Sequence, residues 1–121
     1  MNRGRKISGG KYHQNRKKKL FERATQETVV TLGETKRKII RVNGGNSKTI
    51  LLKSNSVNLT IDNKTKKAEI KNVIETPQNS FLARLNRLSK GTIIQTSLGK
   101  ARITNRPSQE GSINAILIKE K

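Results

Sequence analysis

The chain has 121 residues, of which 31% are hydrophobic and 2% aromatic, so its core must be modest and built from Ile, Leu and Val. Its 27 Lys and Arg residues outnumber 8 Asp and Glu, and the resulting net charge of +19 indicates a polyanionic partner, with nucleic acid the first candidate. The lack of cysteine excludes disulfides, thiolate zinc sites and thiol nucleophiles, and no apolar run is long enough for a membrane span or a signal peptide, so we expect a cytoplasmic protein that binds no membrane.

Residues 1–24 are predicted to form a basic arm. Between residues 3 and 23, nine Lys and Arg residues accompany a single acid, Glu22. Burial of the few apolar residues there cannot offset the loss of conformational entropy on folding, so we expect a disordered arm that orders on its partner. We expect Leu20 and Phe21 to pack on the domain and so to attach the end of the arm to it. The alternative is a solubilising tail. The candidate RNA contacts in the arm are Arg3, Arg5, Lys6, Ser8, Gly9, Gly10, Lys11, Tyr12, His13, Arg16, Lys17, Lys18 and Lys19.

These residue types bind RNA without a fixed site. Lys and Arg neutralise phosphates and release counterions, glycines let the backbone approach closely, and Tyr12 and His13 offer planar groups for stacking on an unpaired base. The stretch GRKISGGKY does not match a nucleotide-binding loop. Gly4 and Gly9 have the required gap but are followed by Gly10, and no apolar strand precedes them.

Residues 25–121 are predicted to form one all-β domain. Short apolar stretches, rich in β-branched residues and bounded by Gly, Asn, Asp and Lys, predict strands at 28–32, 38–42, 48–53, 57–61, 68–74, 92–98, 101–105 and 113–118. A short helical segment is expected within 79–90, capped by Asn79 or Ser80 and ending at Gly91. Six to eight short strands with turns between them favour a small closed or nearly closed β-barrel, or a sandwich.

A second basic cluster flanks the turn RVNGGNSK. Its cations are Lys36, Arg37, Lys38, Arg41 and Lys48, and the turn contributes Gly44, Gly45 and Asn46 as further candidate contacts. Because Arg37 and Arg41 share a strand face with Ile39, that face is predicted to lie outside the core. A charged hairpin that only meets water is the alternative.

Catalytic chemistry is not evident. The sequence has no nucleophile elbow, its one histidine is His13 in the basic run, and its acids are scattered rather than clustered for a metal ion. We expect no enzyme activity, no cofactor, no metal and no small-molecule substrate.

Four stretches together resemble the archaeal and eukaryotic ribosomal protein family S8e of the small subunit. They are GRKISGGKYHQNRKKKLFE, TKRKIIRVNGGNSKTILLK, KTKKAEIKNVIETPQN and KGTIIQTSLGKARITNRPSQEGSINAILI. The resemblance implies a β-barrel-like domain whose basic extension threads into ribosomal RNA, with RNA-facing motifs at residues 3–19 and 41–48. The sequence departs from the family where Arg23-Ala24 replaces the usual Gly-Arg after Phe-Glu, and where a Trp before the first Gly-Arg is missing.

The sequence as a whole indicates a structural ribosomal protein that binds small-subunit RNA, neighbours other ribosomal proteins and is a monomer outside the ribosome. A ribosome-assembly factor with the same barrel is the nearest alternative, although such proteins are longer. A DNA-compacting or regulatory protein is the alternative from another class, but the sequence shows no clear recognition helix, dimer interface or apolar wedge.

Overall fold

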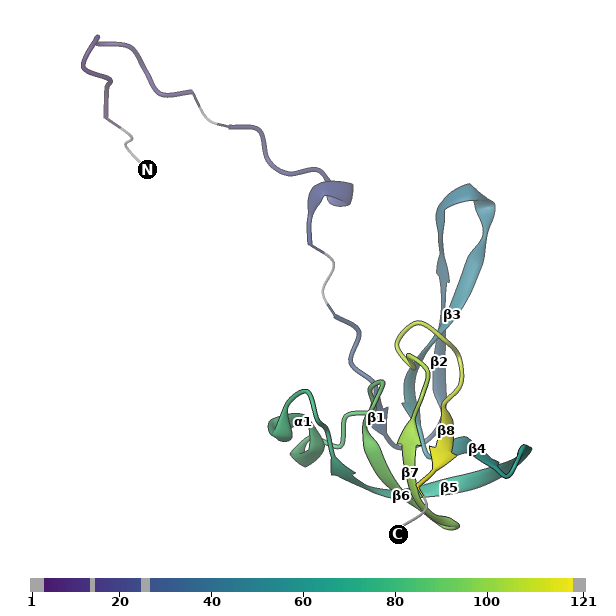
Figure 1. Cartoon of the computed structure of the whole chain (residues 1–121). Coiled ribbons are helices and arrows are strands. Elements are labelled where there is room, and N and C mark those ends of the chain that lie inside the picture. The colour runs from purple at the N-terminus through teal and green to yellow at the C-terminus, as the bar shows by residue number, and fades with distance from the viewer. Residues whose placement is uncertain (1–3, 14, 25–26, 119–121) are drawn as a thin grey trace.

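The fold consists of an extended N-terminal arm, a projecting hairpin and a small barrel (Figure 1). The computed structural model describes residues 4–13, 15–24 and 27–118. Its helical elements are η1 (Leu20–Glu22), η2 (Asn43–Gly45) and α1 (Ser80–Arg84). Its strands are β1 (Thr31–Leu32), β2 (Lys36–Arg41), β3 (Ser47–Ser54), β4 (Ser56–Ile61), β5 (Lys64–Glu75), β6 (Ile93–Thr96), β7 (Gly99–Ile103) and β8 (Asn114–Leu117). The predicted all-β fold is confirmed.

Five strands, β4 to β8, form a closed barrel rather than a sandwich. Each strand pairs antiparallel with the next, and the last strand closes the barrel by pairing parallel with β4, where Leu59 lies opposite Ala115. The Asn58 side-chain amide donates to the Asn114 side-chain oxygen at 3.1 Å across this closing pair. Because the barrel is closed, neither β4 nor β8 is an edge strand that another chain could pair with.

The remaining strands form a second sheet in the order β1-β3-β2. Strands β2 and β3 make an antiparallel hairpin, and its tip projects beyond the barrel (Figure 1). At its base, the backbone N–H of Leu51 donates to the Pro107 carbonyl at 3.2 Å, and Leu51 and Val30 join the core. The hairpin is therefore anchored at one end and free at the other.

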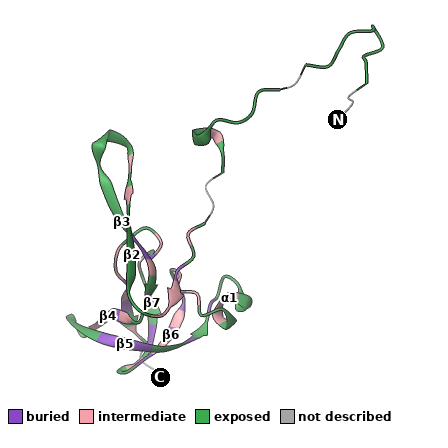
Figure 2. Ribbon diagram, turned by 180° about the vertical axis from the view of Figure 1, so that it is seen from behind, coloured by how far each residue is buried: buried purple, intermediate pink, exposed green. Residues whose placement is uncertain are grey.

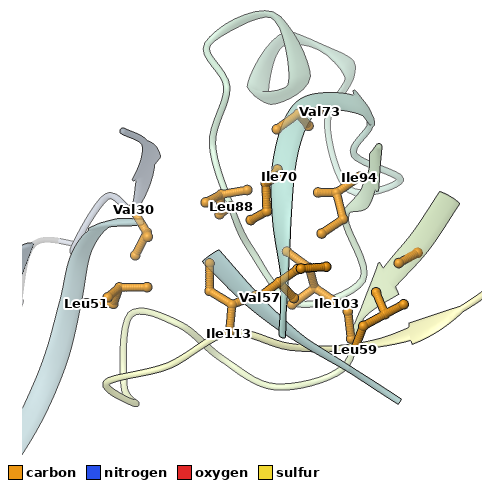
Figure 3. Close-up of a cluster of buried hydrophobic side chains, with 13 residues drawn as sticks. Val30, Leu51, Val57, Leu59, Ile70, Val73, Leu88, Ile94, Ile103 and Ile113 are labelled. Atoms are coloured by element: carbon orange, nitrogen blue, oxygen red, sulfur yellow. The ribbon is translucent and has the colours of Figure 1, made fainter. Parts of the chain in front are cut away.

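The core consists of aliphatic side chains in a single cluster (Figure 3). Buried Val57 and Leu59 alternate with polar residues along β4, which contains the strand predicted at 57–61. Ile70 and Val73 are both buried although they are three residues apart, because the pairing of β5 with β6 shifts register between them. Such a bulge adds one residue and turns both side chains inward. In contrast to the core, nearly all described residues of the arm and of the hairpin tip are exposed to solvent (Figure 2).

The predicted short helix is confirmed, and Asn79 caps it by accepting from the Phe81 N–H at 3.0 Å. Its predicted end at Gly91 is wrong, because the helix ends at Arg84 and Asn86, with a φ of 50°, turns the chain before Leu88. Leu88 is then buried through a non-helical segment, where its N–H bonds to Val30. Leu20 and Phe21 do not tie the arm to the domain, because they are 83% and 81% exposed.

Candidate nucleic-acid interface

The first candidate element is a small hairpin in the arm. Arg5 and Lys11 pair as an antiparallel bridge, and the Lys6 N–H donates to the Gly10 carbonyl at 2.9 Å. The three-residue loop between them contains Ile7, Ser8 and Gly9, and the Gly9 N–H donates to the Lys6 carbonyl at 2.9 Å. Gly9 has a φ of 78°, the left-handed conformation that such loops need at this position. The stretch GRKISGGKY thus has a defined local turn.

This hairpin exposes its charged and planar side chains. The Lys6 ammonium lies 5.7 Å from the centre of the Tyr12 ring, close enough for a cation–π contact on one face of that ring. His13, Lys17 and Lys18 are also exposed. Arg3 lies outside the described residues. Every described residue from 4 to 24 is exposed except Glu22, so the arm presents its cations to a partner rather than to its own barrel.

A second turn in the arm is held by its one acid. Arg16 donates two hydrogen bonds to the Glu22 carboxylate, at 2.6 and 2.8 Å, and the Lys19 backbone N–H donates a third at 3.0 Å. These contacts stabilise the charged carboxylate: the Arg16 hydrogen bond, and after it the Lys19 N–H, lowers the pKa of Glu22. The same pair raises the pKa of Arg16. Arg16 is therefore occupied within the arm.

The third element is the tip of the β2–β3 hairpin. The Val42 N–H donates to the Asn46 carbonyl at 2.8 Å across the turn, and Gly44 and Gly45 have φ values of 76° and 74°. Positive φ at two successive positions explains why two glycines are needed here. The predicted turn is confirmed, and it places Gly44, Gly45 and Asn46 in solvent next to Arg41.

The hairpin cations differ in what they contact. Arg37, Ile39 and Arg41 share one exposed face, as predicted. However, the Arg37 guanidinium donates to the Gly111 carbonyl at 2.7 Å, and the Lys48 ammonium donates to the Gln109 side chain. Both contacts hold the loop at 105–112 against the hairpin. Arg37 and Lys48 thus position the hairpin, whereas Arg41, at the tip, makes no such bond to any residue that the structure describes.

No sequence pattern indicated these loop contacts, because Arg37 and Gly111 are 74 residues apart and Lys48 and Gln109 are 61 apart. A side chain at Gly111 would approach Thr49 to 3.1 Å, so the loop packs closely on β3. The arm and the hairpin remain separate elements: no hydrogen bond or ion pair joins them within the described residues.

Within the ranges 4–13, 15–24 and 27–118, no group of three His, Asp or Glu side chains is arranged to hold a metal ion. Across those same ranges, no helix has the length and apolar character to cross a membrane. The features that the described structure does offer are basic and exposed.

Comparison with known proteins places the chain. Residues 1–118 match the family model described as Ribosomal protein S8e. The chain belongs to the ribosomal protein S8e family. Two relatives named small ribosomal subunit protein eS8 each share 46% identity: that of Methanocella arvoryzae over 116 residues, covering 94% of this chain and 93% of the relative, and that of Methanococcus aeolicus over 121 residues, covering 96% and 93%. A third, from Methanocorpusculum labreanum, is 44% identical over 117 residues.

The S8e match confirms the family resemblance predicted from the sequence motifs. It extends from the arm through the hairpin to the last barrel strand, so all three elements described above belong to the family region.

Proposed function

We propose that this S8e family member is a structural constituent of the small ribosomal subunit that binds small-subunit ribosomal RNA through its arm and its hairpin tip. The observation that carries the proposal is the separation of charge from the core. Between residues 4 and 24, eight cations accompany one acid, yet none of the described residues in this segment belongs to the hydrophobic core. A segment that is so charged and lies outside the core is suited to a polyanion.

The arm supplies most of the binding free energy in this proposal. Lys17, Lys18 and Lys19 are three adjacent exposed cations, and each phosphate they neutralise releases a condensed counterion. The hairpin at Arg5–Lys11 adds backbone that approaches RNA closely at Gly9 and Gly10, together with the Tyr12 ring. Phosphate contacts of this kind fix position and orientation without reading base sequence.

The β2–β3 hairpin acts as a rigid second contact. Its base is fixed by the Leu51–Pro107 hydrogen bond and by the bond from Arg37 to Gly111. Arg41 and the Gly44–Asn46 turn therefore reach RNA without a large loss of conformational freedom. The role is one of assembly rather than turnover: the barrel is a support, and its neighbours are RNA and other ribosomal proteins in the cytoplasm.

The experiment measures the salt dependence of binding to deproteinised small-subunit ribosomal RNA. In the full chain, Lys17→Gln with Lys18→Gln is expected to reduce the slope of log K against log salt by about 1.4 to 1.8, at about 0.7 to 0.9 for each lost phosphate contact. The matched control is Lys64→Gln with Lys66→Gln, which removes the same charge from exposed positions on β5. The proposal predicts a smaller change for that control.

Equal slope changes in the two variants would show that binding follows net charge alone and would contradict the role of the arm. Sedimentation of cell extract tests the cellular assignment. Co-migration with mature small subunits is expected, and restriction to precursor particles would instead support an assembly factor.

A further inference from the structure

Leu20 and Phe21 are the largest apolar pair on the arm, and nothing in the described chain covers them. They lie side by side in η1 and are 83% and 81% exposed. Each of these side chains, while it is exposed, lacks the free energy that burial of a large apolar side chain provides. They lie in a basic arm and outside the hydrophobic core, whose first residue along the chain is Val30, so we infer that a partner covers them.

The η1 turn is held in a fixed shape. The Glu22 carboxylate binds the Arg16 guanidinium through both oxygens and also accepts from the Lys19 N–H. On the other side, the Arg23 guanidinium donates to the Lys18 carbonyl at 3.3 Å. Glu22 is the one acid between residues 3 and 24, and it is used to close this turn. An unbound tail would gain nothing from such a device, whereas a displayed side chain would gain a defined direction.

The surroundings of Phe21 select the chemistry of the partner. The Lys19 ammonium lies 5.9 Å from the centre of the ring, on one face, which leaves the other face for a second contact. Lys17, Lys18 and Arg23 flank the pair in the sequence, so the segment around it is positively charged. A single-stranded nucleic acid offers both a flat face for the ring and negative charge for the cations, because each nucleotide has one base and one phosphate. An apolar protein pocket would have to accept the same cations at its rim.

We propose that Phe21 stacks on an unpaired base of small-subunit ribosomal RNA, with Leu20 packing beside it. Glu22 is a positioning residue, which acts by holding the η1 turn. This inference rests on the proposed function and adds a contact that depends on a base rather than on phosphate charge.

The lack of tryptophan in the chain provides a direct probe. Phe21→Trp places a single indole at the proposed stacking position of the full-length protein. On addition of deproteinised small-subunit RNA, the indole emission is expected to be quenched by the base and to become less accessible to acrylamide. The matched control is Phe81→Trp, because Phe81 is also exposed and has a cation, Arg84, 5.7 Å from its ring centre. Its emission is expected to change little. Quenching that is absent at position 21, or equal at both positions, would overturn the proposal.

Affinity gives the second measurement. Phe21→Ala is expected to weaken RNA binding by about 5- to 150-fold, the range for loss of one stacked base, and to leave the salt slope unchanged because no phosphate contact is lost. Phe21→Tyr is expected to retain most of the affinity, since it keeps the ring. An alanine variant that binds as tightly as the original chain would refute stacking.

The role of Glu22 is tested against its charge. Glu22→Gln removes an acid from a basic arm, which by electrostatics alone strengthens binding to a polyanion. Glu34→Gln removes the same charge from an exposed acid that makes no hydrogen bond or ion pair in the described part of the chain. We expect Glu22→Gln to bind RNA more weakly than Glu34→Gln and to reduce the quenching seen with Phe21→Trp. If the two variants bind RNA equally tightly and Glu22→Gln leaves the quenching of Phe21→Trp unchanged, Glu22 has no positioning role.

The two proposals fail separately. If the arm lysines do not alter the salt slope, the proposed function is wrong. If they do alter it and the indole at position 21 is unquenched, only the stacking inference is wrong.

Discussion

Replacing Leu59 by alanine tests whether tight packing inside the barrel stabilises the domain. Leu59 is 0% exposed, lies in the middle of β4 and pairs with both Lys66 on β5 and Ala115 on β8. Leu59→Ala removes three buried carbons, worth about 2.4 kcal/mol at about 0.8 kcal/mol each. A cavity remains because strands paired on both sides cannot move inward, so the total loss is expected to be about 3 to 4 kcal/mol.

The measurement is urea unfolding of the full chain, followed by circular dichroism, with thermal unfolding as a check. For a domain of this size, a loss of 3 kcal/mol lowers the Tm by roughly 12 °C or more. The control is Ile116→Ala on the neighbouring strand, where the side chain is 53% exposed and leaves no closed cavity. It is expected to cost about 1 kcal/mol. If Leu59→Ala costs no more than Ile116→Ala, the barrel interior is not packed as described and the reasoning is refuted.

Two further predictions concern the turns. Gly45→Ala is expected to lower the free energy of unfolding by about 1 to 2 kcal/mol, because alanine is strained at the positive φ of 74° although the space around the position is open. Gly45→Asn is expected to lower it by less, because asparagine tolerates this conformation. Equal losses for the two variants in urea unfolding would indicate a cause other than backbone conformation. For Glu22, the lowered pKa means that its ion pair with Arg16 is complete above the ordinary glutamate range and is lost as pH falls through the lowered pKa. Titration of the Glu22 carboxyl carbon by NMR is expected to show a midpoint below that of an ordinary glutamate, and Arg16→Gln is expected to raise it; a midpoint that does not respond to Arg16→Gln would contradict the bidentate contact.

The local elements were largely predictable because their causes are local. Asp62 and Asn63, with φ values of 42° and 65°, form the turn between β4 and β5, as expected of residues that tolerate positive φ. The alternation of Val57 and Leu59 with polar neighbours marked one buried strand face. The end of α1 differs from the one expected at Gly91, because Asn86 turns the chain and a bond from the Leu88 N–H to the Val30 carbonyl then replaces the next helical turn.

Long-range arrangements were not predictable from one sequence. The sequence favoured a barrel or a sandwich, and the choice depends on the parallel pairing of β4 with β8, which no local pattern encodes. Charge alone identified the arm and the hairpin as candidate contacts, because clustered cations need no fold to be recognised. It did not reveal that Arg37 and Lys48 bind the loop at 105–112, nor that Phe21 faces solvent, since hydrophobicity predicts burial only where the fold provides a surface.

Because the barrel closes by pairing β4 with β8, it can be completed only late in the synthesis of the chain. The strands that close it meet through Asn58 and Asn114, 56 residues apart, and β8 is the most C-terminal strand among the described residues. Translation delivers the N-terminus first, so the arm is complete well before the barrel has all its strands. Because the contacts that form its two turns all lie within the arm, a nascent chain can present the segment proposed to bind RNA ahead of an unfinished domain.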